Sequence, residues 1–241
     1  MKVEGRNAVY ELLKTDKEID KILVQKDLKD DASKRLINVI RSHKIKLQPV
    51  DKYVIEKESE SKRHQGFIAY VSDYKYFDIE DILAGCNEDN ALVVVLNEIL
   101  DPHNLGSIIR VCECAGAQGL IISKDRCASV SDTVMRISAG ALNHVKVAKV
   151  TNINNAIEQL KDNGFWVYGC EVGGGSIYKS NLTGKIVLVI GGEDSGVKRL
   201  TKEKCDGIIS LPMHGKVNSL NASVACGIAV YEVLRQRENI K

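Results

Sequence analysis

The chain of 241 residues has few aromatic side chains, 5% of the total, and only three prolines. So little aromatic material argues against a protein that binds nucleic acid mainly by stacking on bases. Long apolar runs are also missing. The most apolar stretch, ALVVVLNEIL, is ten residues long and carries Asn97 and Glu98, so we expect no membrane-spanning helix. The first residues, MKVEGRNAVYELL, lack the unbroken apolar region of a secretory signal peptide.

Paired cysteine motifs are absent as well. None of the seven cysteines forms a C-x-x-C pair, and no second cluster completes four zinc ligands beside Cys112 and Cys114. We therefore expect no bound metal. Most of the cysteines lie within predicted strands or helices, which is typical of reduced core thiols in a cytoplasmic protein.

The residues that are present have the composition of an ordinary globular protein, with 44% apolar and 27% charged side chains. The net charge of +2 is unevenly spread: residues 1–72 carry +4, residues 73–90 carry −5 and residues 91–241 carry +3. Two mildly basic blocks are compatible with a polyanionic partner, although ordinary solvated charge explains them equally well. The acidic segment 73–90 is the predicted linker between two domains, residues 1–72 and 91–241.

Hydrophobic periodicity predicts an α/β protein. In the first domain, helical spacing at residues 5–14 and 31–43 alternates with apolar runs at 21–25, 45–50 and 66–72, which favours a small α/β sandwich. The second domain has apolar, β-rich runs such as ALVVVLNEI, GLIIS and KIVLVIGG, which suit a parallel sheet covered on both faces. Helical patterns separate these runs at 104–115, 131–142, 152–163, 197–205 and 221–237.

Polar residues gather first in LNEILDPHNLGSIIRVCECAGA. Asp101 and Pro102 predict a turn after the strand, because proline disfavours helix before it. Asn104 is then a candidate helix N-cap, and Arg110 lies six residues further along the same helix. When this motif is taken alone, a capped helix with a surface arginine is the simpler explanation.

The second gathering is the turn IGGEDSG at residues 190–196. It is no phosphate loop, because Val197 stands where a lysine is needed, and its glycines lack dinucleotide-fingerprint spacing. Gly191 and Gly192 leave backbone groups bare, which suits a flat ligand with hydrogen-bonding edges, such as adenosine. The alternative is a tight turn in which Glu193 and Asp194 cap the next helix.

The third gathering is ISLPMHGKVNSLNASVACGIAVYEVLRQR. Pro212 stops a strand, and Ser219 and Asn221 precede a helix rich in small residues, which permit close packing. Helix capping and plain core packing are the simpler interpretations. Two of the three prolines, Pro102 and Pro212, lie at the strand ends of the first and third stretches. From this placement we predict that the three loops meet.

These three stretches, in this order, closely resemble the three motifs of the SpoU branch of the SPOUT methyltransferases. The amino-terminal EGRNAVYELL and HQGFIAYVS also resemble the accessory domain of the subgroup that methylates a guanosine 2′-hydroxyl in 23S rRNA. The resemblance implies a ribosomal-protein-like α/β sandwich before a parallel-sheet domain with a deep trefoil knot. It also implies a homodimer with sites near the subunit interface.

The resemblance further implies S-adenosylmethionine as the cofactor, lying against Gly191, Gly192, Leu211, Met213 and Leu220. Side chains that contact cofactor or substrate are then Ser219, Asn221 and Glu193, while Asn104 and Arg110 reach the RNA nucleotide. In the first domain we expect RNA phosphate contacts from Arg6, Lys62, Arg63 and His64, which flank the two segments that resemble the family's accessory domain.

The arginine matching Arg110 is often proposed as the general base of this family, but an arginine side chain stays protonated in proteins. We expect Arg110 to bind the adjacent phosphate and to stabilise negative charge on the attacking oxygen. Alternatives are a tRNA ribose methyltransferase, an antibiotic-resistance rRNA methyltransferase, a noncatalytic RNA-binding protein and a nicotinamide dehydrogenase. The intact set of polar motif residues argues against the third, and the missing glycine fingerprint argues against the fourth.

Overall fold

The computed structural model describes residues 1–15, 17–43, 45–72, 74–86, 89–192, 196–217 and 219–238. Its contacts divide the chain into two units, Met1–Lys75 and Tyr76–Lys241, each with its own core. Each unit is described by itself.

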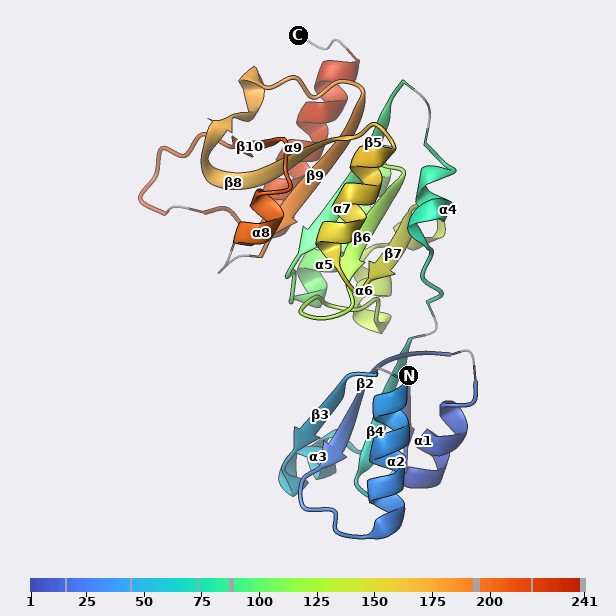
Figure 1. The fold of residues 1–241 in the computed structure, drawn as a ribbon. Coiled ribbons are helices and arrows are strands. Elements are labelled where there is room, and N and C mark those ends of the chain that lie inside the picture. The colour runs from blue at the N-terminus through green and yellow to red at the C-terminus, as the bar shows by residue number, and fades with distance from the viewer. Residues whose placement is uncertain are drawn as a thin grey trace. The chain divides into compact units, whose positions relative to one another are not determined.

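The first unit is a four-stranded sheet with helices on both faces (Figure 1). The strand order is β1 (Lys2–Glu4), β4 (Phe67–Ser72), β2 (Glu18–Gln25) and β3 (Leu47–Val50), and only the β2–β3 pair is parallel. Alternate β2 residues face opposite sides: Ile22 and Val24 pack with α1 (Arg6–Leu12) and α2 (Asp31–Ser42), and Leu23 packs with α3 (Lys52–Glu58). The predicted α/β sandwich is confirmed. The short strand β1 was not predicted, because its only apolar residue is Val3.

The second unit is built on a six-stranded sheet in which every pairing is parallel. The order is β10 (Gly207–Ser210), β8 (Trp166–Ser176), β9 (Lys185–Gly191), β5 (Ala91–Asn97), β6 (Gly119–Ser123) and β7 (Lys146–Val150). All residues of the central strand β5 are buried, as the unbroken apolar run predicts. The predicted parallel α/β fold is therefore confirmed, and the trefoil knot remains a prediction.

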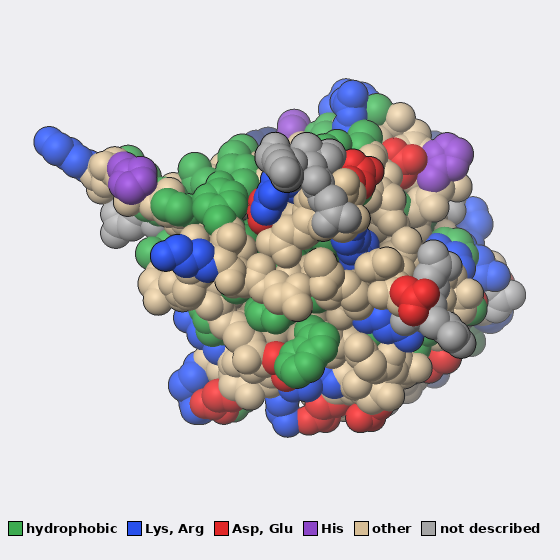
Figure 2. Space-filling model, turned by 90° about the horizontal axis from the view of Figure 1, so that it is seen from above, with side chains coloured by type: hydrophobic (Ala, Val, Ile, Leu, Met, Phe, Trp, Pro, Cys, Tyr) green, Lys and Arg blue, Asp and Glu red, His purple; other side chains and the backbone are tan. Residues whose placement is uncertain are grey.

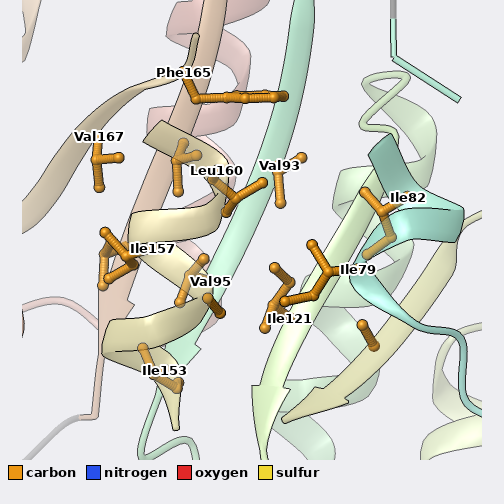
Figure 3. Close-up of a cluster of buried hydrophobic side chains, with 14 of the residues drawn as sticks. Ile79, Ile82, Val93, Val95, Ile121, Ile153, Ile157, Leu160, Phe165 and Val167 are labelled. Atoms are coloured by element: carbon orange, nitrogen blue, oxygen red, sulfur yellow. The ribbon is translucent and has the colours of Figure 1, made fainter. Parts of the chain in front are cut away.

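Helices cover both faces of this sheet (Figure 1). One face is covered by α4 (Ile79–Leu83) and α7 (Ile153–Asp162), whose Ile79, Ile157 and Leu160 lie over the strands (Figure 3). The other face is covered by α5 (Pro102–Cys114) and α9 (Ala222–Arg237), which pack against each other. The remaining helical segments are α6 (Asp132–Ile137), η1 (Ala141–Asn143), η2 (Ile177–Lys179) and α8 (Arg199–Lys202).

Two local expectations need correction. The acidic segment 73–90 is not only a connection, because α4 lies within it and buries Ile79 and Ile82 in the core of the second unit. The helix expected at 131–142 ends at Ile137, because Ala139 and Gly140 have positive φ angles of 49° and 90°. Within the described ranges, no helix combines the length and the apolar content needed to cross a bilayer.

Candidate functional site

A cavity of about 280 Å³ opens where the carboxyl ends of β8, β9 and β10 meet the start of α9. Parallel strands place their carboxyl ends at one edge of the sheet, which is where ligands bind in open α/β sheets. The cavity is lined by all five residues predicted for the cofactor and by Ser219, together with small residues of α9: Gly191, Gly192, Leu211, Met213, Ser219, Leu220, Ala222, Ala225 and Ala229. The second and third motifs therefore share one cavity.

The wall formed by the second motif requires glycine. A Cβ on Gly191 would lie 2.1 Å from the carbonyl carbon of Gly196 and 2.4 Å from the nitrogen of Val197. The Gly196 N–H donates to the Gly192 carbonyl oxygen at 2.9 Å, and Gly196 has a φ of +57°. Gly191, Gly192 and Gly196 therefore pack backbone against backbone beside the cavity.

The first and third motifs meet through two asparagines. Asn221 is the N-cap of α9: its Oδ1 accepts the backbone N–H groups of Ser223 at 3.0 Å and Val224 at 3.4 Å. Its Nδ2 is therefore turned to donate to Oδ1 of the buried Asn104, 3.0 Å away and 117 positions earlier in the sequence. The first motif also reaches the second, because Asn97 at the end of β5 lies opposite Gly191 in the β5–β9 register.

Asn104 is not the N-cap that its sequence position predicts. Helix α5 begins two residues earlier, with Asp101 as N-cap and Pro102 in the first turn, and the Asp101 carboxylate accepts the His103 N–H at 2.9 Å. Asn104 therefore lies inside the first turn, where its side chain is available to Asn221.

Arg110 lies on the exposed face of α5 and does not line the cavity. Among the residues that the structure describes, none forms a hydrogen bond or ion pair with its guanidinium. The group is therefore available to a molecule that arrives from outside. Glu193 lies outside the described residues.

Glu171, in the middle of β8, is a site residue that the sequence did not single out. It lines the cavity, its Oε2 accepts the Val197 N–H at 2.7 Å, and the same oxygen lies 3.2 Å from Lys202 Nζ. The carboxylate thus holds the second motif to α8. Its only sequence signal is a charge at the end of the buried run FWVYGCEV.

The neighbouring Cys170 also lines the cavity. Burial raises the pKa of its thiol far above the ordinary value, so the thiol stays protonated and is a poor nucleophile. Within the described part of the chain, no group of His, Cys, Asp and Glu side chains is placed to hold a metal ion.

The four residues predicted to contact RNA come together in the first unit. The Arg6 N–H donates to Gln65 Oε1 at 3.1 Å, which joins the start of α1 to the loop 59–66 that carries Lys62, Arg63 and His64. The Arg6 guanidinium is paired with Asp30 at 2.8 Å. Lys62 and Arg63 are exposed, and no described carboxylate pairs with their charged groups.

Comparison with protein families assigns both units. Residues 91–231 match the SpoU rRNA Methylase family, and residues 2–77 match the family described as RNA 2′-O ribose methyltransferase substrate binding.

Relatives match the chain over almost its full length. A Staphylococcus saprophyticus protein named for the TrmH family of tRNA/rRNA methyltransferases is 42% identical over 241 residues, covering 99% of this chain and 96% of the relative. The similarly named YacO of Bacillus subtilis is 38% identical, over 99% of this chain and 96% of YacO. The SpoU methyltransferase AviRb of Streptomyces viridochromogenes, solved with AdoMet, shares the fold with a TM-score of 0.63 at 23% identity, over 99% of this chain and 91% of AviRb. The chain belongs to the SpoU methylase family and is an S-adenosylmethionine-dependent RNA 2′-O-methyltransferase.

Proposed function

We propose that this enzyme methylates the 2′-hydroxyl of a guanosine in 23S rRNA, and that the cavity beside Gly191 holds the methyl donor. The observation that carries the rRNA assignment is the complete first unit. It matches a substrate-binding family, and its exposed Lys62 and Arg63 pair with no described carboxylate, which supports a second RNA-binding surface suited to a large folded RNA. A tRNA substrate is the second candidate, because relatives of this length are named for tRNA and rRNA together.

The residues of the cavity fit S-adenosylmethionine on two observations. Gly191 and Gly192 line the cavity with backbone that no side chain covers, while Leu211, Met213 and Leu220 offer apolar surface to a flat ring. The Glu171 carboxylate stands in the same lining. Lys202 balances part of its charge, and a cation is better accommodated beside it than a phosphate. When bound, S-adenosylmethionine supplies an electrophilic methyl group on a positively charged sulfonium.

Asn104 and Asn221 fix the relation between the two helices beside the cavity. Their hydrogen bond joins the first turn of α5 to the N-terminus of α9, so the polar groups of the first and third motifs are held in one geometry. Holding reactants in register is a large part of catalysis for a reaction whose electrophile is already activated. We assign these asparagines to the positioning of the ribose and of the cavity wall.

Arg110 is assigned to the RNA phosphate and to the charge that grows on the attacking 2′-oxygen. Arginine side chains stay protonated in proteins, so the exposed Arg110 guanidinium, which has no partner among the described residues, can donate hydrogen bonds and is not suited to accept the proton. The proton leaves to phosphate or to water. We expect Arg110→Ala to lower kcat roughly 100- to 1,000-fold, as the loss of one donor to a developing oxyanion does.

A pH–rate profile tests this assignment of Arg110. Wild-type enzyme and Arg110→Ala are compared at saturating RNA, with RNA affinity measured separately. Profiles of the same shape, shifted to lower rates, support a charge-stabilising role. A titrating group that disappears in the variant while RNA stays bound would show that Arg110 takes the proton.

The active form is proposed to be a homodimer joined through α9. This helix exposes Val224, Ile228 and Tyr231, which are 49%, 37% and 47% exposed and which share one helical face. Hydrophobic side chains also form a surface patch in the view of Figure 2. An exposed apolar patch of this kind is typical of a protein interface, and Arg110 on the neighbouring α5 would then lie near it.

The decisive experiment is transfer of tritiated methyl from S-adenosylmethionine to unmodified 23S rRNA and to unmodified tRNA, followed by mapping of the product. A 2′-O-methylguanosine in 23S rRNA is the expected result. Methylation of tRNA alone would replace the proposed substrate with the second candidate. Transfer to neither RNA, by protein that binds both, would show that the substrate is a different RNA.

A further inference from the structure

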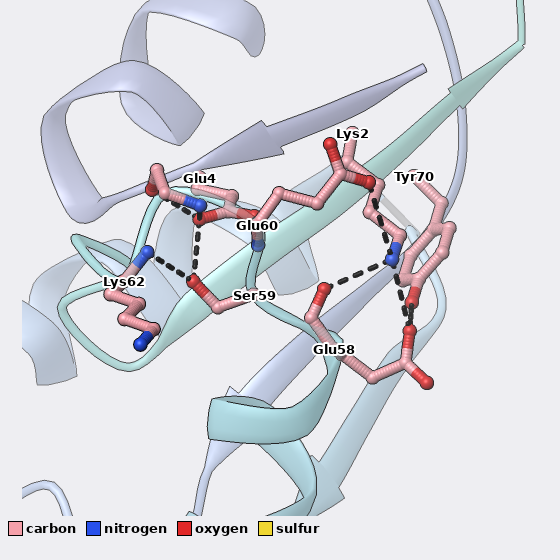
Figure 4. A network of polar contacts seen from close by, with 8 residues as sticks. Lys2, Glu4, Glu58, Ser59, Glu60, Lys62 and Tyr70 are labelled. Atoms are coloured by element: carbon pink, nitrogen blue, oxygen red, sulfur yellow. Dashed lines mark hydrogen bonds and ion pairs between the residues drawn. The ribbon is translucent and has the colours of Figure 1, made fainter.

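The loop 59–66 of the first unit is folded around one carboxylate, that of Glu4 on β1 (Figure 4). Glu4 Oε2 accepts hydrogen bonds from the Ser59 hydroxyl at 2.7 Å, from the Ser61 N–H at 3.2 Å and from the Ser61 hydroxyl. Glu4 Oε1 accepts the Glu60 N–H at 2.6 Å. Two hydroxyls and two successive backbone N–H groups thus surround a single anion, as in an anion-binding nest.

The hydrogen bonds dominate the ionisation of this carboxyl group. Burial by itself would raise the pKa of Glu4, but the bonds from Ser61, Ser59 and the backbone of residues 60 and 61 lower the pKa to about 2. Glu4 is therefore ionised at every physiological pH, and the loop is organised around a permanent charge.

Two relays connect this charge to the basic residues. The Ser59 oxygen, which donates to Glu4, accepts the Lys62 N–H at 2.9 Å. The Ser61 oxygen, which also donates to Glu4, accepts the Arg63 N–H at 3.1 Å. Lys62 is held at a φ of +55°, a left-handed conformation that non-glycine residues adopt only where the surroundings enforce it.

His64 completes the loop with a fixed orientation. Its Nδ1 accepts the Gly66 N–H at 3.0 Å, so in the neutral ring the proton lies on Nε2. Donors of Lys62, Arg63 and His64 are therefore presented from one ordered backbone.

We propose that Glu4 is a positioning residue for RNA binding, which holds Lys62, Arg63 and His64 ready to contact RNA phosphates. The inference rests on the proposed role of the first unit in RNA binding. Preordered cations bind a polyanion without the entropic cost of ordering the loop at the moment of binding. In Glu4→Gln, one acceptor oxygen becomes an NH₂ group that faces the loop's own donors. In place of Oε2 it breaks both relays, and in place of Oε1 it loses the Glu60 N–H bond, while either arrangement removes the charge around which the loop is ordered.

Charge and position predict opposite results for Glu4→Gln. Removing a negative charge near a polyanion strengthens binding on electrostatic grounds alone. Loss of the ordered loop weakens it, and we expect RNA affinity to fall roughly tenfold with a shallower salt dependence. Glu60→Gln is the matched control: it makes the same charge change one residue from the relays, at a side chain that is 79% exposed and lies 3.7 Å from Lys2 Nζ.

The test measures the affinity of the full-length protein for unmodified 23S rRNA at several salt concentrations, with KM and kcat for methyl transfer. Weaker binding and a raised KM in Glu4→Gln, with kcat kept and with Glu60→Gln binding at least as tightly as wild type, support the proposal. Equal effects of the two variants would overturn it. Thermal unfolding checks that both are folded, and Ser61→Ala interrupts one relay without changing any charge, so it must also weaken binding.

A second pair of outcomes separates this proposal from the proposed function. Lys62→Ala/Arg63→Ala must weaken RNA binding, and adding Glu4→Gln to it must weaken binding no further. If the double variant binds and methylates RNA normally, the loop is not an RNA contact, and the proposed role of the first unit fails together with Glu4. If the double variant is impaired while Glu4→Gln is not, only the positioning role is lost.

Discussion

The Gly191→Ala substitution tests the backbone packing beside the proposed cofactor cavity most directly. The added methyl group would lie 2.1, 2.4 and 2.5 Å from three backbone atoms of Gly196 and Val197, whereas ordinary contacts begin at 3.4 Å. Backbone, unlike the end of a flexible side chain, cannot swing away, so the turn must open by about 1 Å.

The size of the effect follows from this overlap. Forcing an extra methyl group into a packed site costs about 1–3 kcal/mol of unfolding free energy. If the displaced turn forms the wall of the cofactor cavity, the same strain reduces the affinity for S-adenosylmethionine roughly tenfold to a hundredfold, since about 1.4 kcal/mol corresponds to a factor of ten.

Calorimetric titration with S-adenosylmethionine and denaturant unfolding measure the two effects of Gly191→Ala. The matched control is Gly175→Ala on β8, where the nearest atom to the new methyl group, the Ile208 carbonyl oxygen, lies at 3.8 Å. We expect this control to bind and unfold like the wild type. A Gly191→Ala protein with unchanged stability and unchanged cofactor affinity would refute both this backbone packing and its role in binding.

Three further predictions concern a cap, an interface and a pH dependence. Asn221→Ser keeps an oxygen that can cap α9 and gives up the donor to Asn104, so in urea it should lose less unfolding free energy than Asn221→Ala, by about 1 kcal/mol; equal losses would contradict the capping role. Ile228→Glu places a charge on the exposed face of α9 and should convert a dimer to monomers in analytical ultracentrifugation, and a wild-type monomer would remove the interface altogether. Because folding lowers the pKa of Glu4 from about 4.5 to about 2, its contribution to stability is complete above about pH 4.5 and is lost as the pH falls toward 2. Acid-unfolding curves of wild type and Glu4→Gln should therefore converge at low pH. A constant offset between them would show that ionisation of the Glu4 carboxylate does not cause the pH dependence of stability.

The segment between the two units shows where prediction from local sequence pattern fails. The negative charge of residues 73–90 predicts a linker, yet Ile79 and Ile82 of α4, in the same segment, are buried in the core of the second unit. A five-residue helix is too short for its periodicity to stand out from a charged background, and its burial depends on the sheet it meets.

The sequence by itself determined the sheet-forming runs, the helices between them and the three polar turns. These depend on side-chain periodicity, proline and glycine, which act over a few neighbouring residues. Only the tertiary structure decided which distant groups meet: Asn104 with Asn221, Glu171 with Val197, and Glu4 with the loop at Ser59–Ser61. Strand order and register bring these residues within hydrogen-bonding distance, and neither is encoded in the spacing along the chain.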